Sequence, residues 1–236
     1  MAVSEVVGST EFIAAIVGAI IGSVTGGVIS YFLQRSATKA AKAERDIDRK
    51  EGQLATAHAI VTKALLIHAH LNSLHNHFEG SLEEAARDGF KGAPSQIIKP
   101  LANMPDEISF SPEEMALFMS LDDLAVFNST LLVDVSYRSL LGAITTFNGL
   151  KTALNEKLLP GELQEGGIVS TVLTGEQMAA LAPRFHEIDS LLDSIRAHLR
   201  ENREAANAAL DTLVSLFNQK LGLGLKIAKK SPSQAG

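Results

Sequence analysis

The chain has 236 residues, of which 46% are hydrophobic and 5% aromatic, and it carries a formal net charge of −6. This acidic balance argues against a general nucleic-acid binder, because such proteins carry an excess of Lys and Arg. The chain contains no cysteine, which excludes disulfide bonds and thiolate metal sites and is compatible with a reducing compartment.

The first predicted element is an apolar segment, residues 12–33, which contains neither a charged residue nor a proline. As a helix it is about 33 Å long at ~1.5 Å per residue, and the hydrocarbon core of a bilayer is roughly 30 Å thick. We therefore expect a single transmembrane helix. It is retained rather than cleaved, since a basic n-region is missing and the apolar stretch is too long for a signal peptide. The alternative is a buried helix of a soluble domain, although such helices are usually shorter and carry a polar stripe.

Small residues recur at every fourth position of this segment and form two neighbouring rows. The first row consists of Gly18, Gly22, Gly26 and Ser30, and the second of Ala15, Ala19, Ser23 and Gly27. Small side chains at this spacing, known as a glycine zipper, allow another helix backbone to approach closely. We expect these residues to mediate helix association in a homo-oligomer, although glycine is also common in membrane helices in general.

The charges that flank this segment predict its orientation. Residues 1–11 contain no Lys or Arg, whereas the basic residues that follow the segment are Arg35, Lys39, Lys42, Arg45, Arg49 and Lys50. The positive-inside rule places this basic flank in the cytoplasm and the short N-terminal tail, 1–11, outside, as in a bacterial inner-membrane protein. We expect Arg35, Lys39, Lys42 and Arg45 to contact anionic lipid headgroups. If the rule fails here, the bulk of the chain lies outside.

Beyond the span, proline-free stretches with apolar residues at three- and four-residue steps predict long helices. They are expected at about residues 36–79, 112–158 and 175–221, with a connector at 80–111 and a mobile tail at 222–236. The predicted fold is all-α: the transmembrane helix is followed by a cytoplasmic domain, 34–221, that forms a long antiparallel, coiled-coil-like three-helix bundle. In this arrangement the connector is distal and the 160–173 loop lies near the membrane.

Each predicted helix has its own apolar stripe. In the first helix the stripe consists of Ala57, Ile60, Ala64, Ile67, Leu71, Leu74 and Phe78. In the second it consists of Leu117, Leu121, Leu124, Phe127, Leu131 and Val135, followed by Leu141, Ile144, Phe147, Leu154 and Leu158. In the third it consists of Leu181, Phe185, Ile188, Leu192, Ile195, Leu199, Asn202, Ala206, Ala209, Leu213 and Leu216. Packed against one another, these stripes are expected to form the core.

Capping signals mark several helix ends. The pairs that match a capping box are Ser111 with Glu114, Thr174 with Gln177, and Ser81 with Glu84. Ser120 with Asp123 offers a further helix start, which would break the second helix near that point, and Gly222 ends the third. The connector is rich in Gly and Pro, and since loops of this length are often functional, we expect it to contact a partner.

No residue is predicted to form a catalytic, cofactor-binding or metal site. The histidine cluster from His68 to His77 lacks the three- or four-residue spacing of helix-borne metal ligands, and within it only His75 with Glu79 is suitably spaced. The chain also lacks the sequence motifs for phosphate binding, dinucleotide binding and serine nucleophiles. It is therefore not expected to be an enzyme.

An anchor, long helical stripes and no catalytic motif favour a scaffold or interaction protein. Such a protein is held in the lipid bilayer, self-associates and presents its cytoplasmic bundle to a protein partner, without binding nucleic acid. The alternative is a membrane-active effector whose small-residue-rich helices assemble into a pore.

Overall fold

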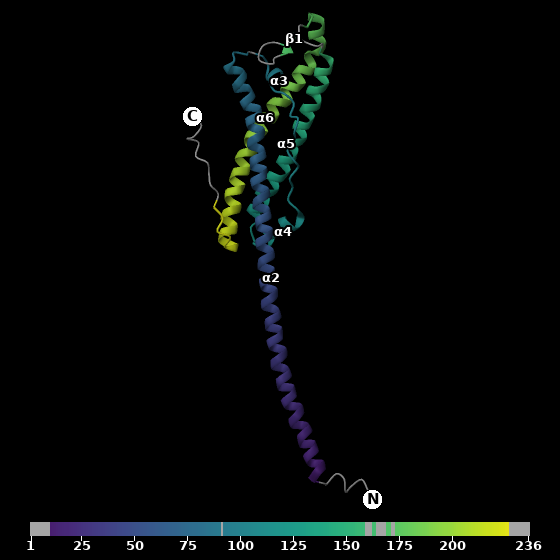
Figure 1. Ribbon diagram of the computed structural model, residues 1–236, viewed down its shortest axis with the longest axis vertical. Coiled ribbons are helices and arrows are strands. Elements are labelled where there is room, and N and C mark those ends of the chain that lie inside the picture. Colours follow the sequence, from purple (N-terminus) through teal and green to yellow (C-terminus); the bar gives the residue numbers. More distant parts are fainter. Residues whose placement is uncertain (1–9, 91, 159–161, 164–168, 171–172, 227–236) are drawn as a thin grey trace. The chain divides into compact units, whose positions relative to one another are not determined.

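The computed structural model describes the backbone of residues 10–90, 92–158, 162–163, 169–170 and 173–226, and the side chains of residues 30–90, 92–158 and 173–226. The elements in chain order are α2 (Thr10–Arg87), α3 (Pro94–Ile97), α4 (Pro112–Ser120), α5 (Leu124–Lys157), β1 (Glu162–Leu163), β2 (Val169–Ser170) and α6 (Gly175–Leu221) (Figure 1). The two short strands pair antiparallel, Glu162 with Ser170 and Leu163 with Val169. The predicted all-α class is confirmed. The chain divides into two compact units, Met1–Gln53 and Leu54–Gly236.

Helix α2 is continuous through the segment predicted to span the membrane and the segment predicted to begin the bundle. The prediction that Ser81 caps the start of a short helix is wrong. Ser81 lies inside α2, where its hydroxyl donates to the carbonyl oxygen of His77 at 2.6 Å. The helix ends beyond that point, where Gly89 adopts a left-handed conformation with φ of 78°. There the amide of Phe90 donates to the carbonyl oxygen of Ala85, at 2.9 Å, which is the hydrogen bond of a Schellman cap.

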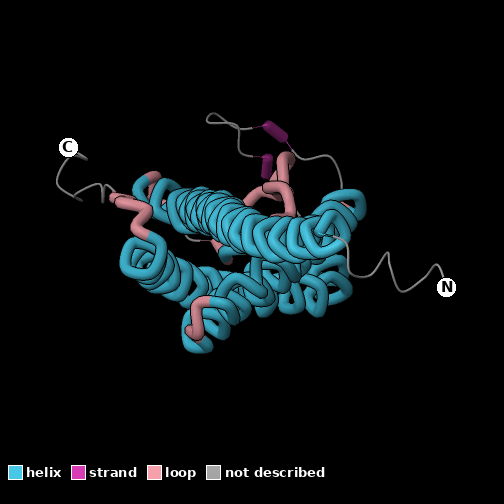
Figure 2. The backbone as a smooth tube through the Cα atoms, turned by 90° about the horizontal axis from the view of Figure 1, so that it is seen from below, coloured by secondary structure: helices cyan, strands magenta, loops and turns pink. Residues whose placement is uncertain are grey.

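The core of the second unit lies between the part of α2 after Leu54, α5 and α6. All seven predicted stripe residues of the first helix, Ala57 to Phe78, are buried. The predicted stripe of the third helix is buried from Ile188 onwards, except for Asn202, whereas Leu181 and Phe185 at its start are partly exposed. The partly exposed Asn202 donates its amide to the carbonyl oxygen of Ser136 at 3.2 Å. Figure 2 shows these helices lying side by side.

The order of the helices differs from the predicted antiparallel succession. Helices α2 and α5 run parallel, as shown by contacts that advance along both: His70 meets Tyr137, and Phe78 meets Phe147. Helix α6 is antiparallel to α2, since its contacts run in opposite directions: Asn72 with Arg203, and Glu79 with Arg196. The all-α bundle is therefore present, but the prediction that each long helix reverses the one before it is wrong.

The connector explains this difference. Rather than crossing the end of the bundle, it runs back along α2: Lys99 lies beside His77, and Ser109 lies beside Lys63. Helix α5 consequently starts at the end of the bundle where Leu54 lies. The end of α5 at Lys157 and the start of α6 at Gly175 therefore lie at the opposite end of the bundle from Leu54. Most of the 160–173 loop, predicted to lie near the membrane, is outside the described residues.

The predicted cap at Ser111 is confirmed, because its hydroxyl accepts from the amide of Glu114 at 3.2 Å. The second helix start, predicted at Ser120 with Asp123 as its partner, lies at Asp123 itself: the Asp123 carboxylate accepts from the amide of Val126 at 3.0 Å, and the Ser120 hydroxyl instead donates to the carbonyl oxygen of Leu117 at 2.7 Å. Between them, Asp122 takes a positive φ of 56° and ends α4. The predicted break is therefore a sharp turn that restarts the helix as α5.

Candidate functional site: an apolar patch and a groove on the bundle

The connector is fixed to the bundle by hydrogen bonds from side chains of α5. The amide of Asn148 pairs with the backbone of Leu101 in both directions, accepting at 3.0 Å and donating at 3.3 Å. The Tyr137 hydroxyl donates to the carbonyl oxygen of Asp106 at 3.0 Å. These contacts satisfy backbone groups that would otherwise be stranded along an irregular segment. The connector is therefore held in a defined position against the helices.

A buried lysine links the connector to both α5 and α6. The Lys151 ammonium donates to the carbonyl oxygen of Ser95, whose own amide donates to the Asp189 carboxylate at 3.0 Å. Burial lowers the pKa of Lys151, an effect that the nearby Asp189 carboxylate partly offsets. A serine beside a lysine is also the composition of a catalytic dyad. Here Ser95 is 0% exposed, so substrate cannot reach it, and the contact positions the connector.

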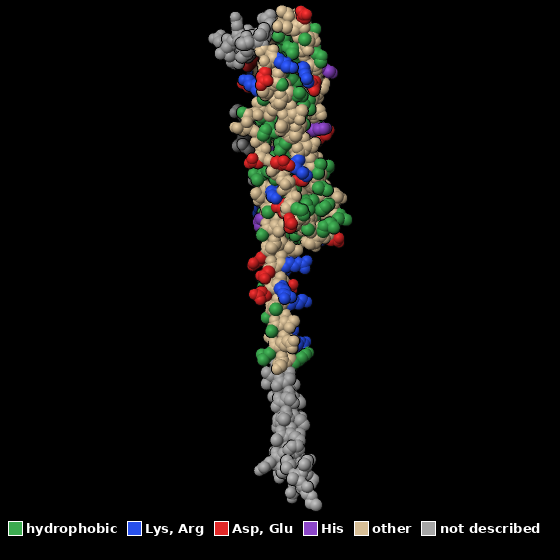
Figure 3. Space-filling model, turned by 90° about the vertical axis from the view of Figure 1, so that its right-hand side faces the viewer, with side chains coloured by type: hydrophobic (Ala, Val, Ile, Leu, Met, Phe, Trp, Pro, Cys, Tyr) green, Lys and Arg blue, Asp and Glu red, His purple; other side chains and the backbone are tan. Residues whose placement is uncertain are grey.

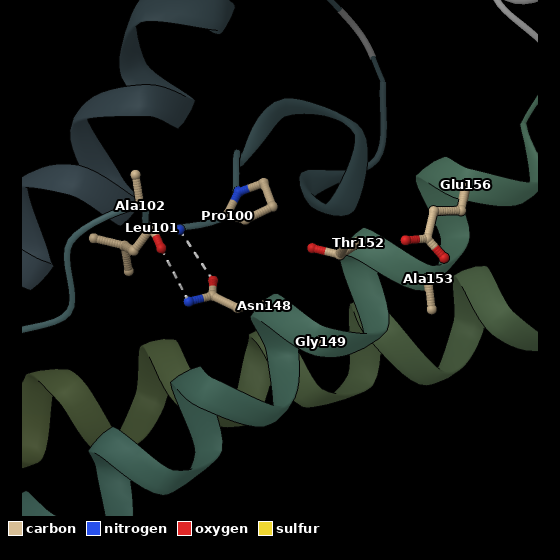
Figure 4. Close-up of a pocket in the computed structure, with 8 residues that line it drawn as sticks. All are labelled: Pro100, Leu101, Ala102, Asn148, Gly149, Thr152, Ala153 and Glu156. Carbon is tan, nitrogen blue, oxygen red and sulfur yellow. Dashed lines mark hydrogen bonds between the residues drawn. The ribbon is translucent and has the colours of Figure 1, made fainter.

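A surface groove lies where the connector meets α5. It has a volume of about 670 Å³ and is lined by Pro100, Leu101, Ala102, Asn148, Gly149, Thr152, Ala153 and Glu156 (Figure 4). Gly149, which has no side chain, and Ala153, one helical turn away with only a methyl group, leave this space open. Glu156 supplies the negative charge of the lining. The groove can receive a side chain or a short peptide, but its lining pairs no nucleophile with a base.

An unexpected feature of the surface is an apolar patch on α4 and α5. Its members are 41–60% exposed: Met119, Leu124, Leu131, Leu132 and Val135. Leu124, Leu131 and Val135 share one face of α5, since they are seven and four residues apart. Figure 3 shows hydrophobic side chains gathered over this part of the bundle.

The patch corrects the predicted stripe of the second helix. Leu124, Leu131 and Val135 were expected in the core, whereas the first half of α5 instead buries Val126, Thr130, Val133, Tyr137 and Leu140. The physical reason is the turn at Asp122 and Asp123, which resets the rotational phase of the helix relative to α4. Leu117, which precedes the turn, is buried as predicted. Further along α5 the prediction is confirmed, because Leu141, Ile144, Phe147 and Leu154 are buried.

The clustered histidines have separate local partners. These contacts are His68 with Asn72 at 3.2 Å, His70 Nδ1 with the Tyr137 hydroxyl at 2.7 Å, and His77 Nε2 with the Lys99 carbonyl oxygen at 3.2 Å. The pKa of His75 is lowered, mainly by burial and then by the charge of Arg203. Within the described part of the chain, no group of three His, Asp or Glu side chains could hold a metal ion.

The residues predicted to meet the membrane lie on α2. Arg35, Lys39, Lys42 and Arg45 are exposed, as is Ser30. The other members of the two small-residue rows, Ala15 to Gly27, have side chains outside the described residues. Among described residues, the segment Ser30–Arg87 is long and apolar enough to cross a membrane by length and composition, but one third of its apolar stretch is buried inside the protein. A core helix also has this property, so the predicted anchor depends on residues 12–33.

Comparisons with family models, with curated proteins and with solved structures find no match to this chain.

Proposed function

We propose that this chain is a single-pass membrane protein that self-associates and acts as a scaffold, presenting its helical bundle to a protein partner in the cytoplasm. The observation that carries the proposal is the apolar patch on α4 and α5. Large apolar side chains gathered on one face usually mark a protein interaction site. Covering them with a partner is favourable by about 25 cal/mol for each Å² removed from water.

The polar interior of the bundle supports binding rather than catalysis. Glu114 is paired with Lys63 at 2.8 Å, and Asp134 is paired with Arg138 at 2.7 Å. Asp134 also accepts from the amide of Phe110 at 3.3 Å. These groups hold the connector and the helices together, so their roles are structural.

The anchor and its orientation are proposed from the first unit. Residues 12–33 are uncharged, and they are helical within α2. The exposed basic side chains that follow, from Arg35 to Arg45, favour the cytoplasmic side of a bacterial inner membrane. A membrane anchor confines the bundle near the bilayer and so raises its local concentration, which favours assembly.

A site-specific photo-crosslinker tests the proposal in cells. Placed at Leu132, which is 60% exposed, it should form an adduct with a second protein, and Leu131→Glu should abolish that adduct. Leu66, 46% exposed on α2, is the matched control position and should give no such adduct. Adducts at Leu132 with lipid or with the chain itself, and with no other protein, would contradict the proposal.

A further inference from the structure

The segment of α2 between Arg35 and Glu51 is a charged helix with no described packing partner. Every side chain from Ser30 to Gly52 is exposed. None of the ion pairs among the described residues involves this segment. Most helical stability in proteins comes from packing one face against a neighbour. The segment thus differs from the rest of α2 after Leu54, which has that packing.

The charges of this segment are sorted onto two opposite faces. At about 100° per residue, Glu44, Asp48 and Glu51 lie within roughly 60° of one another. The basic residues centred on the opposite face are Arg35, Lys39, Lys42, Arg45 and Arg49. Asp46 is the exception on the basic side. In the part of α2 next to the grey residues, Figure 3 shows acidic side chains on one edge and basic side chains on the other.

Much of this sorting is unfavourable for a helix on its own. Glu44 and Asp48 are four residues apart, as are Arg45 and Arg49, and like charges at this spacing repel each other. The attractive spacings are those of Asp46 with Lys42, Arg49 and Lys50, and of Asp48 with Arg45. A solitary charged helix is stabilised by the opposite pattern, in which acidic and basic residues alternate along each face. The observed pattern becomes favourable when each face meets the opposite charge on a neighbouring molecule.

We propose that this segment packs against the same segment of a second copy of the chain, with the acidic face of one copy on the basic face of the next. The proposal rests on the self-association in the proposed function and identifies the contact. In a parallel arrangement the charges match in height: Asp48 falls between Arg45 and Arg49 of the neighbour, because each residue adds only about 1.5 Å. Copies anchored in one membrane share this direction.

The contact is heterologous, because it uses two different faces of each copy. Such contacts propagate from one copy to the next, and they close into a ring only where the rotation between copies allows it. On the flank between the charged faces lies Ile47, 57% exposed, beside Ala40 and Ala43. These alanines are small enough to let two helices approach, so the flank adds apolar contact to the charge pairing.

Charge-swapped full-length chains in lipid nanodiscs test the proposal by mass measurement. One variant carries Glu44→Lys, Asp48→Lys and Glu51→Lys, and the other carries Lys42→Glu, Arg45→Glu and Arg49→Glu. Each alone should lose the oligomer, since like charges then face each other. A one-to-one mixture should regain it, because every contact again joins opposite charges. A matched control, Glu176→Lys with Glu201→Lys and Glu204→Lys on exposed positions of α6, should assemble normally.

The outcomes separate this proposal from the proposed function. A monomeric unmodified chain would contradict self-association itself. If the unmodified chain and both variants all remain oligomeric, self-association is supported and the proposed charge contact is overturned. A mixture that stays monomeric would also overturn it, because recovery in the mixture is what complementary charge requires and what damaged folding cannot give. High salt should weaken the unmodified oligomer by screening exposed charges.

Discussion

Arg196 and Glu79 form a two-pronged ion pair between α6 and α2, in which the Nε and Nη2 atoms of Arg196 each lie 2.8 Å from one carboxylate oxygen of Glu79. Two parallel hydrogen bonds fix both position and orientation, which a single contact does not. The pair ties the two antiparallel helices near the end of α2. Both side chains are partly buried, and each is 29% exposed.

Because of this pair, we expect the free energy of unfolding of the bundle to decrease at acid pH. The hydrogen bonds from Arg196 are the main reason that the pKa of Glu79 is lowered from its ordinary value of 4.5. A carboxyl group whose pKa is lower in the folded than in the unfolded chain stabilises the fold at pH values above the unfolded-state pKa. This stabilisation is lost as the pH falls through the folded-state pKa. We expect Glu79→Gln to cost about 1 kcal/mol in urea unfolding at pH 7 and less at pH 3. An equal loss at both pH values would contradict this role.

Tyr137 links α2, α5 and the connector, since its hydroxyl contacts both His70 and the carbonyl oxygen of Asp106. Burial, with smaller effects of Asp106 and Glu107, raises its pKa to about 12. The neutral phenol therefore contributes its full stabilisation of the fold below about pH 10, the pKa of an unfolded tyrosine. This contribution is lost as the pH rises through the pKa of Tyr137 in the folded chain. The chain has two tyrosines, so ultraviolet titration should show one group near pH 12 that Tyr137→Phe removes.

The same substitution also tests the connector. Tyr137→Phe leaves the Asp106 carbonyl without this donor, and we expect a loss of about 1–2 kcal/mol in unfolding free energy. Limited proteolysis should cut the connector sooner than in the unmodified protein. Ser139→Ala, an exposed change on the same helix, is the control and should alter neither measurement.

The apolar patch and the core should respond differently to substitution. Leu131 is 41% exposed, so Leu131→Glu should change stability by less than about 0.5 kcal/mol. Ile67 is 0% exposed, so Ile67→Ala should cost about 2–5 kcal/mol through lost burial and a cavity. If Leu131→Glu proved as damaging as Ile67→Ala in thermal unfolding, Leu131 would belong to the core.

These contrasts show which features periodicity can predict. The stripe from Ala57 to Phe78 follows one uninterrupted helix, so its spacing was sufficient to identify the buried face. In α5 the spacing alone misassigned Leu131, because several apolar faces were available and the turn at Asp122 selects among them. The choice is made by tertiary packing against α2 and α6, which the local pattern does not contain.

The direction of the connector could not be predicted for a similar reason. Its Pro and Gly residues correctly predicted that no long helix follows Arg87 up to residue 111, but α2 continues through Gly80 to Arg87, and the path of the connector was not predicted. That path is determined by distant side chains, such as Asn148, which pairs with the Leu101 backbone across the groove. Local capping, in contrast, depends on adjacent residues, and so Thr174 with Gln177 opens α6 as predicted.

The small-residue rows give a prediction that separates scaffold from pore. Gly22→Leu with Gly26→Leu should reduce the proportion of oligomer, because bulky side chains hold the helix backbones apart. Membrane potential should remain intact when the unmodified protein is strongly expressed. Depolarisation that disappears in the double variant would instead favour the pore alternative.

The mass of the full-length chain in detergent, measured beside that of residues 54–236, tests the proposed assembly most directly. Residues 54–236 form a compact unit without the anchor and the charged segment. We expect the full-length chain to be an oligomer and the shorter chain a monomer, since self-association is proposed to lie in the first part of α2. A monomeric full-length chain would contradict a self-associating membrane scaffold.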